Sequence, residues 1–361
     1  MTKAIDEAFL RAVPKSDLHV HLDGSLRVTT LVELAQEHHV KLPSYTESGL
    51  RDLVFKPRYA NLSEYLHGFA YTLAVMQTEA ALERIAFELA VDNQEEGVRY
   101  LEVRFAPQLH VHDTLNIVMV LRAANRGLER ARDLYNRRPE ILSGSEPPFA
   151  YGIIVCAMRM FRTGSSQYFT NLLRAHRYAP PKEVFRHASL ELARAAASAR
   201  DEYELPIVGF DLAGEESGYP AVDHIDAYAL AQKKFLRKTV HAGESYGPES
   251  IFQAITDLQT ERIGHGTYLL EPDAITDPAI VDREHYVQQL GQFIADRRIT
   301  LEICLTSNLQ TNPQITDIGQ HTFARLRQHR LSTAICTDNR LISNTKMTRE
   351  LGLAVQAGNM D

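Results

Sequence analysis

The sequence has no tryptophan, only three cysteines and no long hydrophobic run. Cys156, Cys304 and Cys336 are odd in number and far apart, which excludes a disulfide framework and a cysteine-based zinc site. Each lies in an apolar segment, so we expect buried free thiols in a reducing compartment. No apolar stretch approaches the ~18 residues that a membrane span needs, and the N-terminus lacks the apolar core of a signal peptide. These absences predict a cytoplasmic protein that does not enter a membrane.

An excess of positive charge is also missing. The 39 Lys and Arg residues face 46 Asp and Glu residues, which gives a net charge of −7. A chain this acidic is a poor candidate for binding nucleic acid or an anionic membrane surface, because both require a basic face. Its 361 residues, 44% of them hydrophobic and 24% charged, are typical of a globular protein with a large core. Histidine is frequent, with 15 residues, so some histidines are candidate ligands.

Short apolar runs alternate with amphipathic stretches along the chain. The runs rich in Val, Ile, Leu and Cys predict eight buried parallel strands at 16–22, 100–106, 150–158, 207–213, 238–243, 262–266, 300–306 and 332–338. The stretches 80–96 and 248–260 have helical spacing of apolar residues. This rhythm favours an α/β TIM (β/α)8 barrel. A doubly wound open sheet is the alternative, but its usual G-x-G-x-x-G after the first strand is missing.

The sequence shows no internal repeat and no linker, so residues 1–361 are predicted to form a single TIM-barrel domain of a metal-dependent hydrolase. Residues 40–80 separate the first strand from the next strong helix. Within this segment Leu62, Tyr65, Leu66 and Phe69 have helical spacing. They form either ordinary core or a helical lid inserted after the first strand, over the mouth of the barrel.

Two histidines two residues apart, His19 and His21, lie on the first predicted strand. Residues two apart on a strand point to the same side, which in a barrel is the interior. Imidazoles buried there need a metal ion or hydrogen bonds. A second such pair, His110 and His112, follows Pro107 outside the strand pattern, and we expect it to lie in a solvated loop.

The first pair has partners at other predicted strand ends. His241 ends the fifth strand, His265 the sixth and Asp338 the eighth. Taken singly, each of these residues could have only a structural role, and Glu244 alone could be an ordinary loop carboxylate. Because the carboxyl ends of barrel strands converge on one face, together they predict a site for zinc or another divalent ion. The fourth strand lacks the lysine that two-metal hydrolases on such barrels often use, so one metal ion is favoured.

The motifs at these strand ends resemble the adenosine deaminase family. They are SDLHVHLDGSLR at 16–27, GVRYLEVRFAP at 97–107, GFDLAGEE at 209–216, HAGE at 241–244, RIGHG at 262–266 and TDN at 337–339. They occur in the family's order over nearly the whole chain. The family has a TIM-barrel fold, binds one zinc ion per chain and removes the 6-amino group of a purine by hydrolysis. The resemblance therefore implies zinc-dependent deamination of adenosine, and of 2′-deoxyadenosine, to inosine-type products and ammonia.

The resemblance also implies a role for each matching residue. The implied zinc ligands are His19, His21, His241 and Asp338. The implied catalytic residues are Glu244, as proton donor to purine N1, His265, which orients and helps deprotonate the attacking water, and Asp338 as its partner. The implied substrate contacts are His21, Asp23 at the ribose 5′-hydroxyl, the Gly214 N–H at N3, and a lid of Leu62, Tyr65, Leu66 and Phe69.

Chemistry supports these roles independently, since deamination by water needs an activated water and a carboxylic acid kept protonated in a closed pocket. Related adenine deaminases usually carry Glu in place of Asp23, which favours a nucleoside here. Two departures stand out. Asn339 replaces the family's usual second Asp, and we expect its amide to donate to purine N7. The chain also ends soon after Asp338, which fits either a trimmed end or a surface covered in a homo-oligomer.

Two other functions remain open at this stage. One is deamination of another 6-aminopurine, such as adenine or a modified adenine nucleoside or nucleotide. The other is a catalytically silent binding barrel. The complete set of candidate metal ligands and acids argues against this second alternative.

Overall fold

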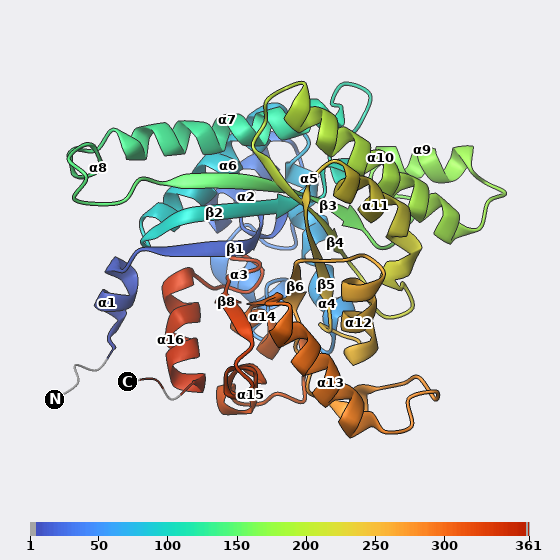
Figure 1. Ribbon diagram of the computed structural model, residues 1–361. Coiled ribbons are helices and arrows are strands. Elements are labelled where there is room, and N and C mark those ends of the chain that lie inside the picture. The colour runs from blue at the N-terminus through green and yellow to red at the C-terminus, as the bar shows by residue number, and fades with distance from the viewer. Residues whose placement is uncertain (1–4, 359, 361) are drawn as a thin grey trace.

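Eight parallel strands in sequential order make up one sheet in the computed structural model, which describes residues 5–358 and 360. The strands are β1 (Lys15–His21), β2 (Val98–Phe105), β3 (Ala150–Met158), β4 (Ile207–Ala213), β5 (Arg237–Ala242), β6 (Arg262–His265), β7 (Thr300–Ile303) and β8 (Ser332–Ile335). Each strand pairs in parallel with the next one along the chain. The predicted barrel strands are therefore confirmed (Figure 1).

The sheet closes on itself beside the candidate ligands. The backbone N–H of Asp338 donates to the carbonyl oxygen of His19 over 2.8 Å, and that of His21 donates to the carbonyl oxygen of Asp338 over 2.7 Å. Val20, between the two histidines, thereby forms a parallel bridge with Asp338. Barrel closure thus brings Asp338 to the end of β1.

Helices alternate with the strands and surround them (Figure 1). In chain order they are α1 (Glu7–Ala12), α2 (Val28–Glu37), α3 (Glu47–Leu53), α4 (Leu62–Leu66), α5 (Phe69–Val75), α6 (Glu79–Gln94), α7 (Ile117–Asn136), α8 (Pro139–Leu142), α9 (Gln167–Ala175), α10 (Pro181–Asp201), α11 (Ile225–Lys233), α12 (Pro248–Thr256), α13 (Arg283–Asp296), α14 (Leu305–Thr311), α15 (Phe323–Gln328) and α16 (Met347–Ala357). The helices predicted at 80–96 and 248–260 correspond to α6 and α12 and are confirmed, although α12 ends at Thr256, before the predicted end.

Helix α6 shows how the sequence specifies these elements. The hydroxyl of Thr78 accepts from the N–H of Ala81, which satisfies one free donor of the first turn. Its apolar stripe is buried and includes Leu82, Ile85 and Leu89. Burying each such side chain contributes about 1.5–3 kcal/mol, so this stripe holds α6 against the barrel.

Five helices, α2 to α6, follow β1 before the next strand, which confirms an insertion between the first two strands. Among them, α4 buries Leu62 and Tyr65, and α5 begins at Phe69. The side chain of Asn61 accepts from the N–H of Glu64 and caps α4.

The last two strands are shorter than the sequence pattern predicts. Strand β7 ends at Ile303, because the Cys304 carbonyl oxygen accepts the N–H of Asn308 and starts α14 instead of extending the sheet. Strand β8 ends at Ile335, and Asp338 follows with a φ of 59°, which turns the chain out of the strand direction.

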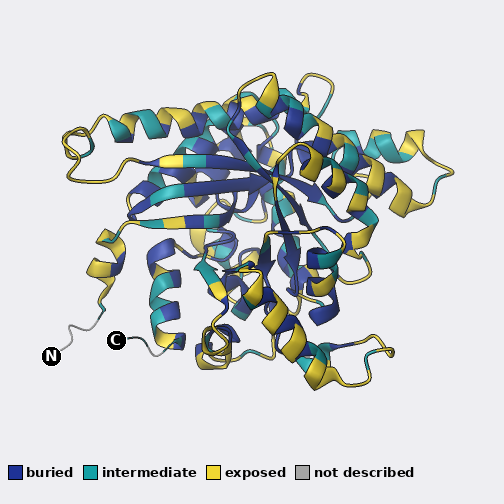
Figure 2. Ribbon diagram, viewed as in Figure 1, coloured by how far each residue is buried: buried dark blue, intermediate teal, exposed yellow. Residues whose placement is uncertain are grey.

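The strands are largely buried and the outer helix faces are exposed (Figure 2). The three cysteines are free and buried, as expected. Among residues 5–358 and 360, no helix combines the length and apolar character that crossing a membrane requires. That residues 1–361 form a single domain stays a prediction.

Candidate metal and catalytic site

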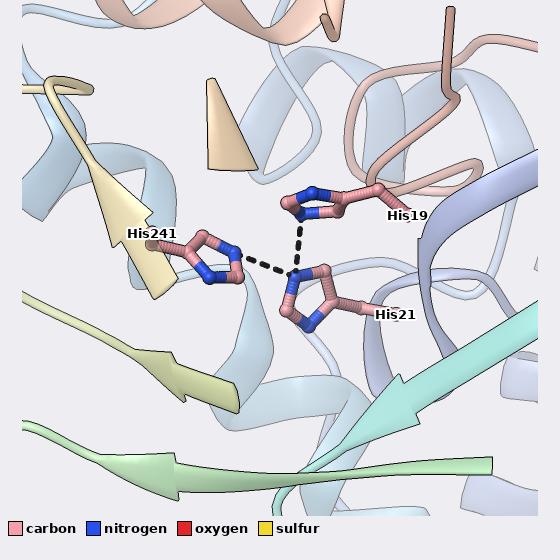
Figure 3. A group of neighbouring side chains, drawn as sticks. All are labelled: His19, His21 and His241. Carbon is pink, nitrogen blue, oxygen red and sulfur yellow. Dashed lines mark hydrogen bonds between the residues drawn. The ribbon is translucent and has the colours of Figure 1, made fainter. Parts of the chain in front are cut away.

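Three imidazoles converge at the carboxyl ends of two strands (Figure 3). His19 and His21 come from β1, and His241 comes from β5 on the far side of the barrel. The Nε2 atom of His21 lies 3.3 Å from Nε2 of His19 and 3.1 Å from Nε2 of His241. All three residues are buried.

A carboxylate joins these imidazoles. The Oδ1 atom of Asp338 lies 3.5 Å from Nε2 of His21 and 3.7 Å from Nε2 of His19. Burial raises the pKa of Asp338 to about 6, although the charge of His241 opposes this. The structure thus brings together all four residues that the resemblance implies as metal ligands.

Two buried carboxylates orient two of the imidazoles from behind. Nδ1 of His19 lies 2.8 Å from Oε2 of Glu302, and Nδ1 of His241 lies 3.1 Å from Oδ2 of Asp211. A carboxylate accepts hydrogen bonds, so in the neutral imidazoles Nδ1 carries the proton and Nε2 carries a lone pair. Both lone pairs then face Nε2 of His21.

The fully buried Arg104 bridges the two carboxylates. Its guanidinium nitrogens lie 3.0 Å from Asp211 and 2.8 Å from Glu302. Burial opposes ionisation of Asp211, but His241 and Arg104 still hold its pKa below the usual value. Sequence reasoning did not single out these three residues. The available signal was a single acid in each of the apolar strands β4 and β7, whereas Arg104 shares β2 with Arg99 and Glu102.

The converging lone pairs fit a bound cation. In the neutral rings, nitrogen lone pairs about 3 Å apart repel one another unless a proton or a metal ion lies between them. Two ligands in a tetrahedral zinc site, at about 2.1 Å from the metal, are separated by about 3.4 Å. The observed separations of 3.1 and 3.3 Å are close to that value. His19, His265 and Asp338 form a second, overlapping group with ligand atoms within 4.8 Å of one another.

Glu244 lies on the loop after β5 and is buried beside the imidazoles. Burial raises the pKa of Glu244 to about 8, with the nearby charges of Asp338 and Glu216 acting in the same direction against that of His241. The carboxyl group is therefore protonated at neutral pH and able to donate.

Glu216, which the sequence analysis did not single out as a site residue, holds this loop. One of its oxygens accepts the N–H of Gly243 over 2.7 Å, and the other accepts the N–H groups of residues 244, 245 and 246 over 2.8–3.1 Å. Its side chain is buried, so these charge-assisted bonds fix the backbone that carries Glu244. The acidic pair in GFDLAGEE was the signal for this residue.

His265 faces Glu244 across the site. Its Nε2 lies 3.5 Å from Oε1 of Glu244, and its Nδ1 lies 3.0 Å from Nδ2 of Asn308. Burial, together with the charges of His241 and Arg104, lowers the pKa of His265 well below its ordinary value, so the ring is neutral. Its φ of 69° is a strained backbone conformation for a residue with a side chain.

Asn339 is buried next to Asp338. Its Nδ2 donates to Oδ1 of Asp338 over 2.7 Å, which leaves one amide hydrogen free for a ligand. A Cβ on Gly24 would lie 1.8 Å from Oδ1 of Asn339, so only glycine permits this placement.

A small cavity of about 40 Å³ lies among the candidate catalytic residues. Its walls include the candidate lid and substrate contacts Leu62, Tyr65, Leu66, Phe69, Gly214 and Asn339, together with His21, His241, Glu244, His265 and Asp338. A larger cavity of about 530 Å³ shares part of this wall and continues past Asp23 along α5. Each substrate-binding residue implied by the sequence thus lines one of the two cavities.

The prediction that His110 and His112 lie in a solvated loop is wrong for His110. Its ring is fully buried, with Nδ1 2.9 Å from the carbonyl oxygen of Met76. His112 is partly buried and bonds through Nε2 to the carbonyl oxygen of Gln77. Backbone carbonyls at the end of α5, rather than water, satisfy this pair.

A family model described as adenosine deaminase matches residues 14–181 and 182–361. Adenosine deaminase 1 of Streptomyces coelicolor is 36% identical over 355 residues, which cover 96% of this chain and 78% of the relative. The adenosine deaminase of Mycolicibacterium vanbaalenii is 34% identical, over 99% of this chain and 88% of the relative. The chain belongs to the adenosine deaminase family.

Solved structures of deaminases share the fold with this family member. Adenine deaminase from Arthrobacter aurescens superposes with a TM-score of 0.73 at 20% identity, over 96% of this chain and 89% of that one. The N6-methyl-AMP deaminase of Arabidopsis thaliana gives 0.72 at 24% identity, over 99% and 89%. An amidohydrolase from Burkhoderia ambifaria with bound Zn gives 0.73 at 18% identity, over 100% and 85%. At these identities the likeness establishes the barrel fold of this adenosine deaminase family member.

Proposed function

We propose that this chain hydrolyses adenosine and 2′-deoxyadenosine to inosine and 2′-deoxyinosine, with release of ammonia. One observation carries the proposal: the buried carboxyl of Glu244, whose pKa burial raises to about 8, lines the same cavity as converging imidazoles that fit a cation. The relatives that are named adenosine deaminases, at 34–36% identity, support the same reaction.

We propose that the ion is zinc, one per chain, held by His19, His21, His241 and Asp338. Three imidazoles and one carboxylate suit a borderline divalent cation, and the Zn-bound amidohydrolase shares the fold. When bound, the ion would supply Lewis acidity that lowers the pKa of water toward neutrality. Orientation of His19 and His241 by Glu302 and Asp211 supports metal affinity, since such partners fix the tautomer and ring direction.

Glu244 is proposed as the general acid. Its neutral carboxyl donates a proton to purine N1 as the water oxygen attacks C6, which makes C6 tetrahedral. The resulting carboxylate accepts one proton of the attacking water and passes it to the departing amino group, and it then accepts the second water proton and is neutral again. The C6–N bond breaks with loss of ammonia, and the oxygen stays on C6 as the carbonyl of inosine.

The substrate contacts follow from the cavity walls. We propose that the Gly214 N–H donates to N3 and that the second amide hydrogen of Asn339 donates to N7. Asp23 would accept from the ribose 5′-hydroxyl, with His21 beside it. Leu62, Tyr65, Leu66 and Phe69 would cover the purine as the lid.

The charge of the larger cavity supports a nucleoside rather than a nucleotide. The described residues that line it include no lysine or arginine, and its ionisable side chains are His21, Asp23 and Cys156. A 5′-phosphate next to the Asp23 carboxyl would have no cation to pair with.

We also propose a reducing, cytoplasmic location, which the three buried free cysteines support. The proposal includes a homo-oligomer.

Ammonia release from a panel of substrates tests the proposed function. We expect adenosine and 2′-deoxyadenosine to be deaminated at least 100-fold more efficiently, in kcat/KM, than adenine, AMP or N6-methyl-AMP. A preference for adenine or for a nucleotide would identify another 6-aminopurine deaminase. Absence of turnover on the whole panel by the zinc-loaded chain would favour a binding barrel.

A further inference from the structure

A chain of buried polar side chains leads away from His265, on the side opposite the reacting atoms. Nδ1 of His265 lies 3.0 Å from Nδ2 of Asn308, on α14. Oδ1 of Asn308 lies 3.2 Å from Nε2 of His321. The exposed fraction of each of the three residues is 2% or less, so water does not compete for these bonds.

At the far end of this row of side chains, the direction of hydrogen-bond donation is fixed. His321 directly precedes the start of α15, and its Nδ1 accepts the backbone N–H of Phe323 over 3.1 Å. Phe323 is the first residue of α15, so its N–H has no acceptor within the helix. A backbone N–H is only ever a donor, so Nδ1 of His321 must carry a lone pair.

The positions of the other hydrogens in this row of side chains follow from the Phe323 N–H donor. Burial lowers the pKa of His321 to about 4, so the ring is neutral and carries its proton on Nε2. That Nε2–H donates to the Asn308 oxygen, and the Asn308 amide then donates to Nδ1 of His265. If the amide were reversed, its N–H would face the N–H of His321.

We propose that Asn308 and His321 hold His265 in the tautomer that carries its proton on Nε2, and so make His265 a hydrogen-bond donor toward the reacting atoms. Asn308 and His321 are positioning residues, because they act on the site through His265. The inference rests on the proposed function for its catalytic meaning, and on the hydrogen-bond chain alone for the tautomer.

Two consequences follow for the site. A protonated Nε2 cannot ligate a metal, so the inference favours the ligand group with His21 and His241 over the overlapping group with His265. It also leaves no lone pair on His265 toward the reacting oxygen. His265 then stabilises that oxygen by donating to it instead of deprotonating the water, and proton transfer falls to Glu244, whose carboxyl lies 3.5 Å from His265.

Nitrogen-15 NMR of histidine-labelled protein measures this tautomer directly, because protonated and unprotonated ring nitrogens resonate in well-separated regions. The His265 signals would be assigned by their loss in His265→Gln. In the metal-free and the zinc-loaded wild type at neutral pH, we expect the protonated signature on Nε2 and the unprotonated one on Nδ1. The opposite pattern, or two protonated nitrogens, would overturn the proposal.

Asn308→Asp tests the cause of the tautomer. A carboxylate cannot donate, so the proton of His265 should move to Nδ1, and kcat should fall at least tenfold with unchanged zinc content and circular dichroism. His321→Gln retains a side-chain donor toward Asn308 and should keep the wild-type tautomer. If Asn308→Asp folds and His265 keeps its proton on Nε2, Asn308 does not set the tautomer.

The NMR result separates this inference from the proposed function. A wild type with the proton on Nε2 but no activity on adenosine would overturn the function and support the hydrogen-bond chain. An active wild type with the His265 proton on Nδ1 would support the proposed function and overturn the proposed tautomer.

Discussion

At the scale of single residues, the site contains buried carboxyl groups in opposite protonation states. Burial raises the pKa of Glu244 to about 8, while His241 and Arg104 outweigh burial at Asp211 and hold its pKa low. A protonated carboxyl can donate to a substrate nitrogen, whereas an ionised one can only accept. The same side-chain chemistry thus serves as an acid at one position and as an orienting partner for His241 at another.

Glu244→Gln should bind adenosine but hardly turn it over. The amide has nearly the same shape and can donate a hydrogen bond to N1, but it cannot transfer a proton. We expect kcat to fall about 10²–10⁴-fold, as for loss of a general acid. Calorimetry should show retained nucleoside binding, and metal analysis should show retained zinc. If more than a tenth of kcat remains, Glu244 is not the acid.

Asn339 should contribute to binding of the purine through N7. In 7-deazaadenosine a C–H replaces N7, so the second amide hydrogen of Asn339 would lose its acceptor. We expect kcat/KM to fall by an amount equivalent to about 1–3 kcal/mol, the usual cost of an unpaired buried polar group. The Asn339→Ala variant should show nearly the same kcat/KM for 7-deazaadenosine as for adenosine, because the interaction with N7 is already missing. Equal kcat/KM for both substrates in the wild type would leave Asn339 as a residue that only shapes the turn.

At the scale of elements, a few buried carboxylates fix the loops at the mouth of the barrel. Glu216, after β4, accepts backbone N–H groups from the loop after β5. Glu350, on α16, accepts the N–H of Thr306 on α14 and the hydroxyls of Thr306 and Thr345. Each joins segments that are far apart in the sequence.

Glu216→Gln should displace the loop that carries Glu244. The substitution replaces one carboxylate oxygen by an amide N–H group, which cannot accept hydrogen bonds from the backbone N–H groups of the loop. We therefore expect the free energy of unfolding to fall by about 2–3 kcal/mol. Because small misplacements of catalytic groups are costly, kcat should fall at least tenfold. Glu215→Gln, at the neighbouring and more exposed position, is the matched control and should change neither quantity. Equal effects of the two substitutions would contradict a specific role for Glu216.

Glu350 should make stability depend on pH. Burial raises the pKa of Glu350 from its usual 4.5 to about 7, so the folded chain binds this proton more tightly than the unfolded chain. The corresponding stability is present below pH 4.5 and is lost as the pH rises toward 7. Over that range, the free energy of unfolding of the wild type should fall by about 3 kcal/mol relative to Glu350→Gln. Urea unfolding at pH 4–8 measures this difference.

Exposed Glu284, on α13, provides the control for this pH dependence. The difference between the wild type and Glu284→Gln should stay constant over the same pH range. A constant difference for Glu350→Gln as well would contradict a proton held by Glu350 in the folded state.

Most elements were predictable from the sequence, because buried parallel strands are continuous apolar runs and helices repeat every three to four residues. The ends of β7 and β8 were not, because α14 and the turn at Asp338 depend on contacts made only in the closed barrel. The site divides in the same way. His19, His241 and Glu244 lie in recognisable motifs, but Asn308 and His321 are linked to His265 only by folding.

At the scale of the whole molecule, barrel closure assembles the metal site. The candidate ligands come from β1, β5 and the segment after β8, and their orienting carboxylates come from β4 and β7. An unfolded chain does not hold these groups together, so metal binding should stabilise the folded state by mass action. A chelator should therefore lower the Tm of the wild type and leave that of His241→Ala nearly unchanged.

Zinc content per chain tests the proposed centre most directly. Elemental mass spectrometry of purified, zinc-reconstituted protein should find about one zinc per chain in the wild type, as for a site of four protein ligands. His241→Ala should lose most of this zinc, whereas His187→Ala, an exposed control on α10, should retain it. Full zinc occupancy in His241→Ala would show that these imidazoles do not form the metal site.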